Sequence, residues 1–517
     1  MRPTTWTFFS GLLLASCALG PDYHGPPSEE QAAPAKFKNA SASKDWKVAK
    51  PSDAEAGGRW WTIFHDSNLD RLVDQALTRN QDLRQAAARI AESRSQARVA
   101  AADLYPQVTL NPLAQRQRMT NTGPIQKAKL VGSNPFASAI PATGAGAATG
   151  GSTAGASSSS SSSSADTILA TQPVTTTYDL FRAPLNAVWE VDLFGRIRRS
   201  YEAARMQAQA SEADFRNMAL IVSANVAVDY FSIRSLDAEI AVLERTIATR
   251  REAVRLADER QKAGLTNELD VTRARADLAT NEADLYAVRR TRGQVEDALA
   301  TLLGEAASDL KLPAHPLKAG DNPPSVPPGL PSALLERRPD VSSAERQLAA
   351  SNARIGVATA AFFPQISLSA VAGFESADIS KLFRWESRAW TVGGSLVQPI
   401  FEGGRNVANL ASARAAYEES IAAYRGQLLK AFQEVEDSLN DLRNLSGQAE
   451  AQDRAVTAAR RALELSQQQY EHGSVTFLDV LDAERTLLAD ERVSAQLLGQ
   501  RLQATVQLVK ALGGAWH

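Results

Sequence analysis

The amino-acid sequence contains an internal repeat, which restricts the possible folds more than composition does. Leu104–Leu110 reads LYPQVTL, and Phe362–Leu368, 258 positions later, reads FFPQISL. Farther along, Gly264 is followed by the tripeptide LDV that starts five residues later. The same arrangement begins at Gly473, an offset of 209. The offset falls by 49, so the first copy carries an insertion of that length. Because repeats at such a period are structural units, we expect one architectural unit built twice.

The insertion lies between Leu110 and Glu190, where the chain becomes poor in large apolar side chains. Residues 142–165 are only Gly, Ala, Thr and Ser, including an unbroken serine run at 157–164. Such a segment cannot bury enough apolar surface to offset the entropy lost on ordering. We therefore predict a low-complexity loop over residues 119–170.

Each copy contains a long helix with a seven-residue apolar period, which predicts a coiled-coil-like seam with left-handed supercoiling. At 1.5 Å per residue, a helix from Gly195 to about Lys262 would extend roughly 100 Å. Helices over residues 82–103 and 267–303 would together match much of that length. The apolar series are Ala219, Val226, Ile233, Ile240, Ile247 and Val254, then Ile421, Leu428, Val435, Leu442, Ala449, Val456, Leu463 and Tyr470.

Two short segments read as the tips of helical hairpins. In 262–267 and 471–476 a glycine stands where a helix ends, and Asn or Thr stands where the next one begins. Glycine at the end and a short polar residue at the start are the usual helix caps. The predicted tip residues are Gly264, Leu265 and Thr266, then Gly473, Ser474 and Val475.

The remaining segments alternate between apolar and polar residues, as strands do. Residues 185–193 and 366–374 show this period, and Trp390, Val392 and Leu396 mark another strand. Alternation over about ten residues is typical of a strand that crosses an outer membrane, with lipid on one side and water on the other. Four strands cannot close a barrel, and open edges lack backbone partners in lipid. The pattern thus predicts an oligomer.

Composition excludes several classes of protein. A net charge of -2 and a mean hydropathy of -0.25 give no reason to expect nucleic-acid binding, and no run after the N-terminus is predicted to span a bilayer as a helix. Gly403-Gly404-Arg405 lacks the spacing of a phosphate-binding loop. The histidines have no metal-ligand spacing, so we predict no enzyme, cofactor or metal. They are His24, His65, His315, His472 and His517.

The N-terminus has the features of a lipoprotein signal. Residues 1–16 carry Arg2, an apolar stretch and small residues before Cys17, the single cysteine. Leu14-Ala15-Ser16-Cys17 resembles a bacterial lipobox, which implies cleavage before Cys17 and its acylation. Several acyl chains together anchor a protein stably. Ala18 follows rather than an aspartate, which by resemblance to sorting rules favours the outer membrane.

Four stretches show a resemblance to a known family. They are CALGPDY at 17–23; WWTIF at 60–64 leading to NQDL at 80–83 and ARI at 88–90; FEGGR at 401–405; and the stretch 470–483. The chain resembles the outer-membrane factors of resistance-nodulation-division efflux systems, of the TolC, OprM and NodT type. The resemblance implies an α+β membrane protein: a homotrimer with a 12-stranded β-barrel, a 12-helix periplasmic α-barrel and an equatorial domain. It also implies an exit duct that works with a periplasmic adaptor and an inner-membrane pump.

Pattern and resemblance together divide the chain into nine parts. The N-terminal parts are a signal peptide at 1–16 and a lipidated N-terminus with an equatorial segment and first upper helix at 17–103. The first repeat continues with a strand pair at 104–194, which includes the extracellular loop at 119–170, and a long helix and hairpin at 195–303. An equatorial linker at 304–337 leads to a second upper helix at 338–361, a second strand pair at 362–402, a second long helix and hairpin at 403–512, and a tail at 513–517.

Asp479 and Asp482 are three residues apart, so on a helix both project from one face. From spacing alone they are an acidic first turn favoured by the helix dipole. The resemblance instead implies a periplasmic gate of Leu478, Asp479, Asp482 and Tyr470, in which rings of carboxylates attract cations and repulsion raises their pKa. The first copy has Asp270 and Arg273 there, so that pair is not duplicated. Plain packing explains Tyr470 equally well, and the tips are implied to contact the adaptor.

Two other functions remain open from the sequence. The outer-membrane duct of a type I protein-secretion system shares this architecture. A structural periplasmic coiled-coil lipoprotein would explain the helices and the lipobox, but it leaves the alternating strands unexplained.

Overall fold

A computed structural model describes residues 18–27, 38, 58–118, 177–264, 266–318, 321–324, 326 and 337–514. Cys17, the signal peptide, Leu265 and the loop 119–170 lie outside the described residues. The chain forms two compact units. Unit 1 comprises Met1–Asp22, Gln96–Ala203 and Ala353–Arg414, and unit 2 comprises Tyr23–Ser95, Ala204–Asn352 and Ala415–His517.

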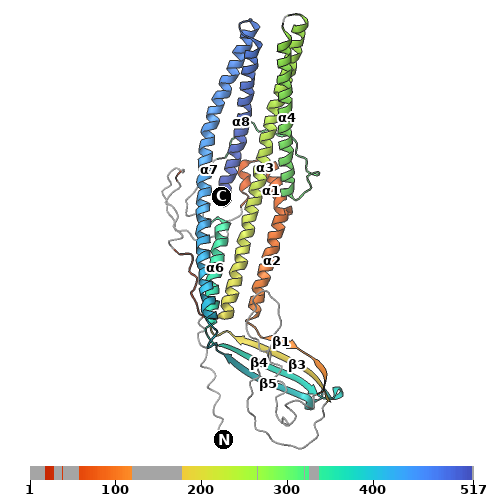
Figure 1. The fold of residues 1–517 in the computed structure, drawn as a ribbon, viewed down its shortest axis with the longest axis vertical. Helices are drawn as coiled ribbons and strands as arrows, with labels where there is room; N and C mark the ends of the chain where they lie inside the picture. Colours follow the sequence, from red (N-terminus) through yellow and green to blue (C-terminus); the bar gives the residue numbers. More distant parts are fainter. Residues whose placement is uncertain are drawn as a thin grey trace, which may run out of the picture. The chain divides into compact units, whose positions relative to one another are not determined.

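Unit 1 contains an antiparallel sheet of five strand segments in the order β1-β3-β4-β5, with β2 also paired to β3 (Figure 1). Pro112 separates β1 from β2, and proline has no N–H to give to a ladder. The two segments pair with successive parts of β3, so they form one interrupted row. The bounds are Gln107–Leu110 for β1, Leu113–Arg118 for β2, Thr177–Val191 for β3, Gln365–Ser376 for β4 and Arg388–Val397 for β5.

The strand register confirms the predicted alternation. Ala372 pairs with both Leu185 and Trp390, and Leu368 pairs with Trp189, so these apolar side chains share one face. Period-two alternation puts the polar residues between them on the other face. That face carries Asn186, Glu190, Ser367, Ser369 and Thr391. The prediction was wrong at the ends of β3, which begins eight residues before Leu185 and ends before Leu193.

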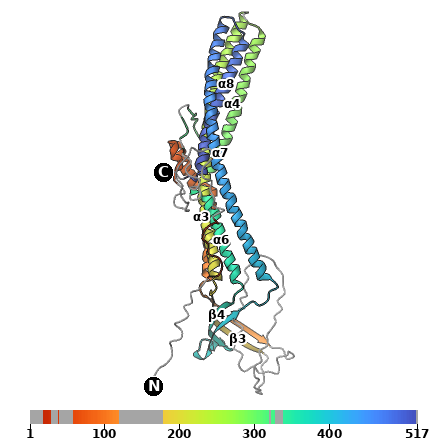
Figure 2. The same cartoon turned by 90° about the vertical axis from the view of Figure 1, so that its left-hand side faces the viewer.

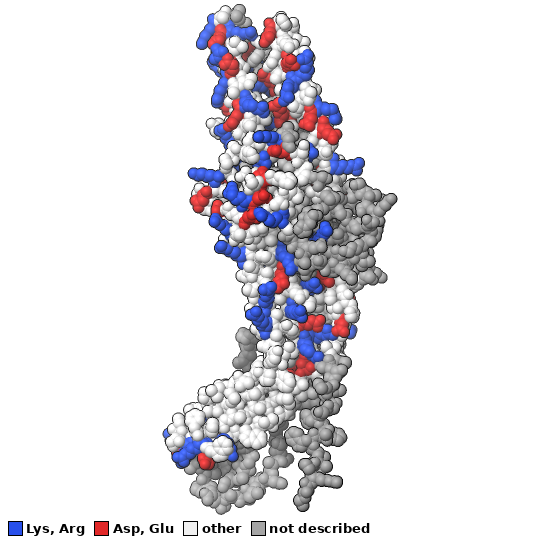
Figure 3. Space-filling view, turned by 180° about the vertical axis from the view of Figure 1, so that it is seen from behind, with Lys and Arg blue, Asp and Glu red and all other residues white. Residues whose placement is uncertain are grey.

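The outer strands leave two edges of this sheet open. Among the described residues, β1 and β2 pair only with β3, and β5 pairs only with β4. Exposed apolar side chains gather on the sheet and near its ends, including Trp390, Val392 and Phe401. In Figure 3 the visible sheet surface is largely uncharged, with charged side chains at its loop end. A chain with this sheet needs further strands before it can be stable in lipid.

Long helices make up most of the remaining structure, and α3 lies beside α4 while α7 lies beside α8 (Figures 1 and 2). The structure confirms the long helix predicted from Gly195 to Lys262. Four helices, α2, α3, α6 and α7, continue from one unit into the other. The bounds are α2 Gln81–Ala102, α3 Arg196–Lys262, α4 Glu268–Leu303, α6 Pro339–Ala360, α7 Arg405–Glu471 and α8 Phe477–Ala511.

The predicted seven-residue series form the less exposed side of the long helices. Leu428 and Val435 are fully buried, as is Val226 in α3. The other members of both series are buried or half-buried, while most positions between them on α7 are exposed. The apolar period therefore marks the packed seam, as expected for coiled-coil-like helices.

The main core of unit 2 joins the N-terminal segment to the long helices. The short helix η1 (Trp60–Phe64) and α1 (Ser67–Arg79) pack apolar side chains against α3, α4 and α8. Helix α1 was not predicted, although Leu69, Leu72, Val73 and Ala76 have helical spacing and are all fully buried. Asp66 caps this helix by accepting from the backbone N–H groups of residues 68 and 69.

The prediction that no later run could span a bilayer as a helix was too strong. One 18-residue window of α3 reaches a mean hydropathy of 1.2, and 56% of that window is buried inside the structure. Helix α3 supplies Val222, Val226, Phe231 and Ile233 to the core of unit 2. Its apolar character is accounted for by that packing, since a core helix passes the same test of length and composition.

Candidate functional site at the hairpin tips

The first hairpin tip turns at Gly264 in unit 2. Gly264 has a φ of 72°, a left-handed conformation that favours glycine, and its N–H donates to the Gln261 carbonyl at 2.9 Å. Asn267 caps α4, because its side-chain oxygen accepts from the Asp270 N–H at 3.0 Å. The Thr266 hydroxyl donates to the Asp270 carboxylate at 2.7 Å. These bonds confirm the predicted end and start of the two helices.

The second tip repeats this geometry. Gly473 also has a φ of 72°, and its N–H donates to the Tyr470 carbonyl at 3.0 Å. The Ser474 N–H reaches back to the Gln469 carbonyl at 2.8 Å, which completes a Schellman motif. Val475 is half-buried, whereas Ser474 is exposed. Turn chemistry alone therefore explains both glycines, and the exposed tip residues leave a surface free for contact.

Three of the four predicted gate residues, Leu478, Asp479 and Asp482, lie on the first turns of α8, whereas Tyr470 lies at the end of α7. Leu478 is 47% exposed, and the side chains of Asp479 and Asp482 are also exposed. Asp479 accepts from the Thr476 N–H at 2.8 Å and from its hydroxyl at 2.7 Å, which forms the acidic half of a capping box. These hydrogen bonds from Thr476 lower the Asp479 pKa within one chain. The increase expected from repulsion in a ring has the opposite sign, and it stays a prediction.

Tyr470 links two helices near the tips. Its hydroxyl accepts from the Arg260 guanidinium at 2.7 Å, and the same guanidinium lies over the tyrosine ring at 5.3 Å. The ring also contacts Phe477 at a centroid distance of 5.7 Å. The end of α3 is thus joined to the end of α7 and the start of α8. The sequence pointed to Tyr470 but not to Arg260, which reads there only as a basic residue of a last helical turn.

A buried charge cluster beyond the tips was not predicted. Arg250 of α3 and Asp277 of α4 are 2% and 3% exposed, and their Nε and Oδ2 atoms are 2.9 Å apart. From α8, Glu484 pairs with Arg250, and the Arg485 Nε lies 2.7 Å from the Asp277 Oδ1. Burial raises the Glu484 pKa. This cluster fastens α8 to the first hairpin, and heptad counting missed it because it seeks only apolar positions.

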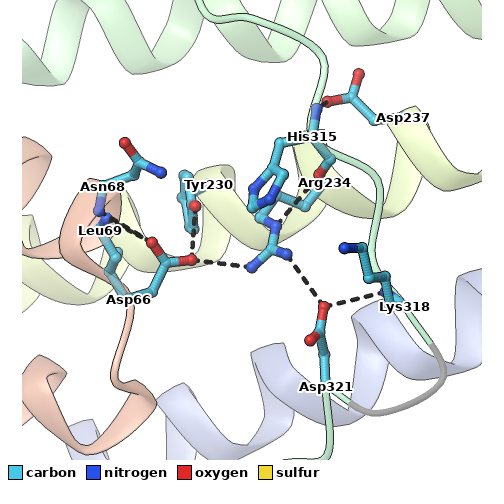
Figure 4. Close-up of polar contacts among 9 residues, drawn as sticks. All are labelled: Asp66, Asn68, Leu69, Tyr230, Arg234, Asp237, His315, Lys318 and Asp321. Carbon is cyan, nitrogen blue, oxygen red and sulfur yellow. Dashed lines mark hydrogen bonds and ion pairs between the residues drawn. The ribbon is translucent and has the colours of Figure 1, made fainter.

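A second polar cluster, again not predicted, surrounds Arg234 (Figure 4). Arg234 of α3 donates to the carboxylates of Asp66 at 2.9 Å and Asp321 at 3.1 Å, and to the His315 carbonyl at 3.3 Å. The Tyr230 hydroxyl donates to Asp66 at 2.7 Å. One buried arginine therefore joins the segment before α1 to the linker after α4.

The described residues contain no group of three or more His, Cys, Asp or Glu side chains that could hold a metal ion. Positive and negative side chains are interspersed over the helices on the face shown in Figure 3.

Comparisons with known proteins agree across nearly the whole chain. The sequence profile of the family described as outer membrane efflux protein matches residues 72–141, 152–305 and 330–514. The cation efflux system protein CusC of Escherichia coli O6:H1 is 32% identical over 512 residues, covering 99% of this chain and 98% of CusC. The pyoverdine export outer membrane protein OpmQ of Pseudomonas aeruginosa is 31% identical over 506 residues, covering 98% and 95%.

Solved structures show the same fold. The outer-membrane channel OprN superimposes with a TM-score of 0.78 at 30% sequence identity, covering 97% of this chain and 100% of that one. Since both the sequence and the fold match over nearly the whole chain, the similarity includes the strands and both helical hairpins.

Proposed function

The chain belongs to the outer membrane efflux protein family, and we propose that three copies of it close one duct whose tips meet a periplasmic adaptor. It is a non-enzymatic outer-membrane efflux channel, which serves as the exit duct of a pump. The assembly state, the gate residues, the partners and the lipid anchor are parts of the proposal.

The open sheet is the observation that carries the proposal. One face is apolar, the other is polar, and both edges lack partners within the described chain. In lipid, backbone groups at an edge must be paired, so further strands must come from other chains. Three chains of four strand rows give a 12-stranded barrel, an even number within the range of bacterial outer-membrane barrels. The apolar face then meets lipid and the polar face lines the bore.

The helices support a continuous wall in the same assembly. Each chain supplies the long α3 and α7 together with the shorter α2, α4, α6 and α8. If the shorter helices pair end to end beside the long ones, each chain gives four helical rows and three chains give a 12-helix tube. The Arg234 cluster and the core around Trp60 form the equatorial domain of each chain.

We place the resting closure at the start of α8. Leu478, Asp479 and Asp482 are exposed there, and threefold symmetry turns each into a ring. Tyr470, through its contact with Arg260, holds the second hairpin against the first in each chain. Carboxylate rings in a narrow bore attract cations, so the closed state binds cations at this level.

The hairpin tips suit a docking role. Gly264, Thr266, Gly473, Ser474 and Val475 lie at the turns, and Leu265 between them is outside the described residues. We assign these tips to the periplasmic adaptor, and an inner-membrane pump of the resistance-nodulation-division class delivers the cargo through it. CusC and OpmQ are named for different cargo at similar identity to this chain, so the inner-membrane pump, rather than the duct, selects the cargo.

Conductance across planar lipid bilayers tests the proposal. Purified protein should form channels of low resting conductance, and the double variant Asp479→Ala/Asp482→Ala should raise that conductance. The matched control is Glu252→Ala/Glu259→Ala, which removes two exposed carboxylates whose ion pairs with Arg255 stay within α3. A protein that leaves the bilayer impermeable contradicts a duct. An unchanged resting conductance in the double variant removes these carboxylates from the gate.

A further inference from the structure

The segment that follows Cys17 is held tightly within unit 1. The Leu19 N–H donates to the Phe194 carbonyl at 3.1 Å, so the first described residues run beside the end of β3. Ala18 and Leu19 are half-buried. This packing is unusual for the start of a mature chain, because terminal residues are ordered only where contacts tie them down.

Arg199 of α3 contacts this segment through its guanidinium. The residue is only 4% exposed. Its guanidinium donates to the carbonyls of Leu19 at 3.3 Å and Gly20 at 3.4 Å, and to the Asp22 carboxylate at 2.6 Å. A fourth contact, to Glu202 at 2.8 Å, fixes the guanidinium from its own helix. One buried side chain therefore grips both the backbone and a side chain of the segment.

Glycines remove the side chains that would otherwise keep the segment away. A Cβ on Gly356 of α6 would lie 3.0 Å from the Leu19 carbonyl oxygen and 2.8 Å from the Arg199 Cγ. A Cβ on Gly20 would meet the Gly356 Cα at 2.5 Å, and one on Gly195 would meet the Ala18 Cα at 2.7 Å. The distances from 2.5 to 2.8 Å are shorter than real Cβ contacts, and 3.0 Å is tighter than most of them, so a side chain at any of the three positions would force its neighbours to shift.

These contacts lie where the strands end and the helices begin. Gly195 stands between the end of β3 at Val191 and the start of α3 at Arg196. Consecutive Cα atoms are about 3.8 Å apart, so Cys17 is one residue from the contact of Ala18 with Gly195. The described residue that follows Cys17 in the sequence is therefore held beside the end of β3.

We propose that Arg199, Gly195 and Gly356 form a seat that fixes the lipid anchor of Cys17 to the rim of the barrel. The partner of this seat is the phospholipid leaflet that faces the periplasm. The inference rests on the proposed acylation of Cys17. Arg199 acts as a positioning residue, since it holds the segment that carries the modification. The anchor is then a fixed part of the channel wall and sets its depth in the membrane, in place of a flexible tether.

Electron paramagnetic resonance of a nitroxide at Pro21→Cys tests the seat in the full, acylated chain. Pro21 is exposed and lies between the gripped residues Gly20 and Asp22. The acylated Cys17 sulfur is a thioether, so only the introduced cysteine takes the label. We expect an immobilised spectrum, its loss in Arg199→Met and Gly356→Val, and its retention in Arg354→Met, which removes an exposed arginine of α6.

Asp22→Asn removes one ion pair from an exposed side chain and serves if Arg199→Met does not fold. It should give a mixture of mobile and immobile spectra. A mobile label in the otherwise unaltered protein, or spectra that none of these variants changes, overturns the seat. Mass spectrometry of the N-terminal peptide separates the two proposals: an acylated protein with a mobile label retains the anchor without the seat, whereas an unmodified Cys17 overturns both.

The yield of membrane-inserted oligomer distinguishes a residue that positions the anchor from one that only stabilises the fold. If Arg199 acts by orienting the anchor, Arg199→Met should lower the yield of membrane-inserted oligomer when Cys17 is present. It should add little to the loss already caused by Cys17→Ser, because both changes then remove the same coupling. Additive losses in the double variant contradict the positioning role.

Discussion

At the scale of single residues, Asp479 is subject to two opposing influences. Thr476 lowers its pKa through two hydrogen bonds, whereas like charges in a ring would raise it. A carboxyl group with a lowered pKa contributes stability above its ordinary value of 3.8, and that contribution is lost as pH falls through the folded-state value. The capping bonds thus favour an ionised ring at neutral and mildly acidic pH.

We therefore expect Mg²⁺ to lower the conductance of the channel at pH 7 and at pH 5, and to lose this effect only when the pH falls below 3.8, the ordinary pKa of an aspartate. The Asp479→Ala/Asp482→Ala variant should be insensitive to Mg²⁺ throughout. Bilayer recordings over this pH range provide the measurement. Loss of the Mg²⁺ effect already above pH 5 would show that repulsion between the three chains outweighs the helix cap.

The contact between Arg260 and Tyr470 leads to a second prediction at this scale. Arg260→Met and Tyr470→Phe should each raise the resting conductance, since each removes the hydrogen bond that joins α3 to α7. The double variant should resemble the single variants, because contacting residues do not add independently. Arg255→Met is the control, as its ion pairs with Glu252 and Glu259 stay within α3. If all three of these variants conduct like the Arg255→Met control and the unaltered protein, Tyr470 has only a packing role.

At the scale of elements, α1 packs into the core of unit 2 through one apolar face. Leu72→Ala should lower the free energy of unfolding by about 2 to 5 kcal/mol, because it opens a cavity in a fully buried site. Arg71→Ala, an exposed neighbour on the same helix, should change it by less than about 0.5 kcal/mol. Denaturant titration of the purified protein measures both. If Leu72→Ala lowers the free energy of unfolding as little as Arg71→Ala does, α1 is not part of the folded core.

The elements that the sequence predicted well are those with a long period. The seven-residue series located α3 and α7, and the glycine and cap pairs at Gly264 and Gly473 located both turns. Contacts between distant segments could not be predicted in this way. Arg234 and Arg250 each pair with carboxylates from other elements, and nothing in their local sequence distinguishes them from solvated arginines. Helix α1 has apolar residues at helical spacing, but four positions make too short a series to be recognised in the sequence.

At the scale of the whole molecule, the alternating strands predicted an oligomer on physical grounds, whereas the number of chains came from resemblance alone. The register supports the first step, since it puts Leu185, Leu368 and Trp390 on one face of a sheet with open edges. A single chain carries no information about how many sheets close a barrel, because that number depends on strand tilt and stagger between chains.

Native mass spectrometry of the detergent-extracted protein tests the central claim most directly. If three sheets close one barrel, the dominant species should have three times the mass of the mature chain, and it should remain intact when the detergent micelle is removed in the gas phase. A dominant single chain, or an assembly of any other number, would contradict the account of a shared bore.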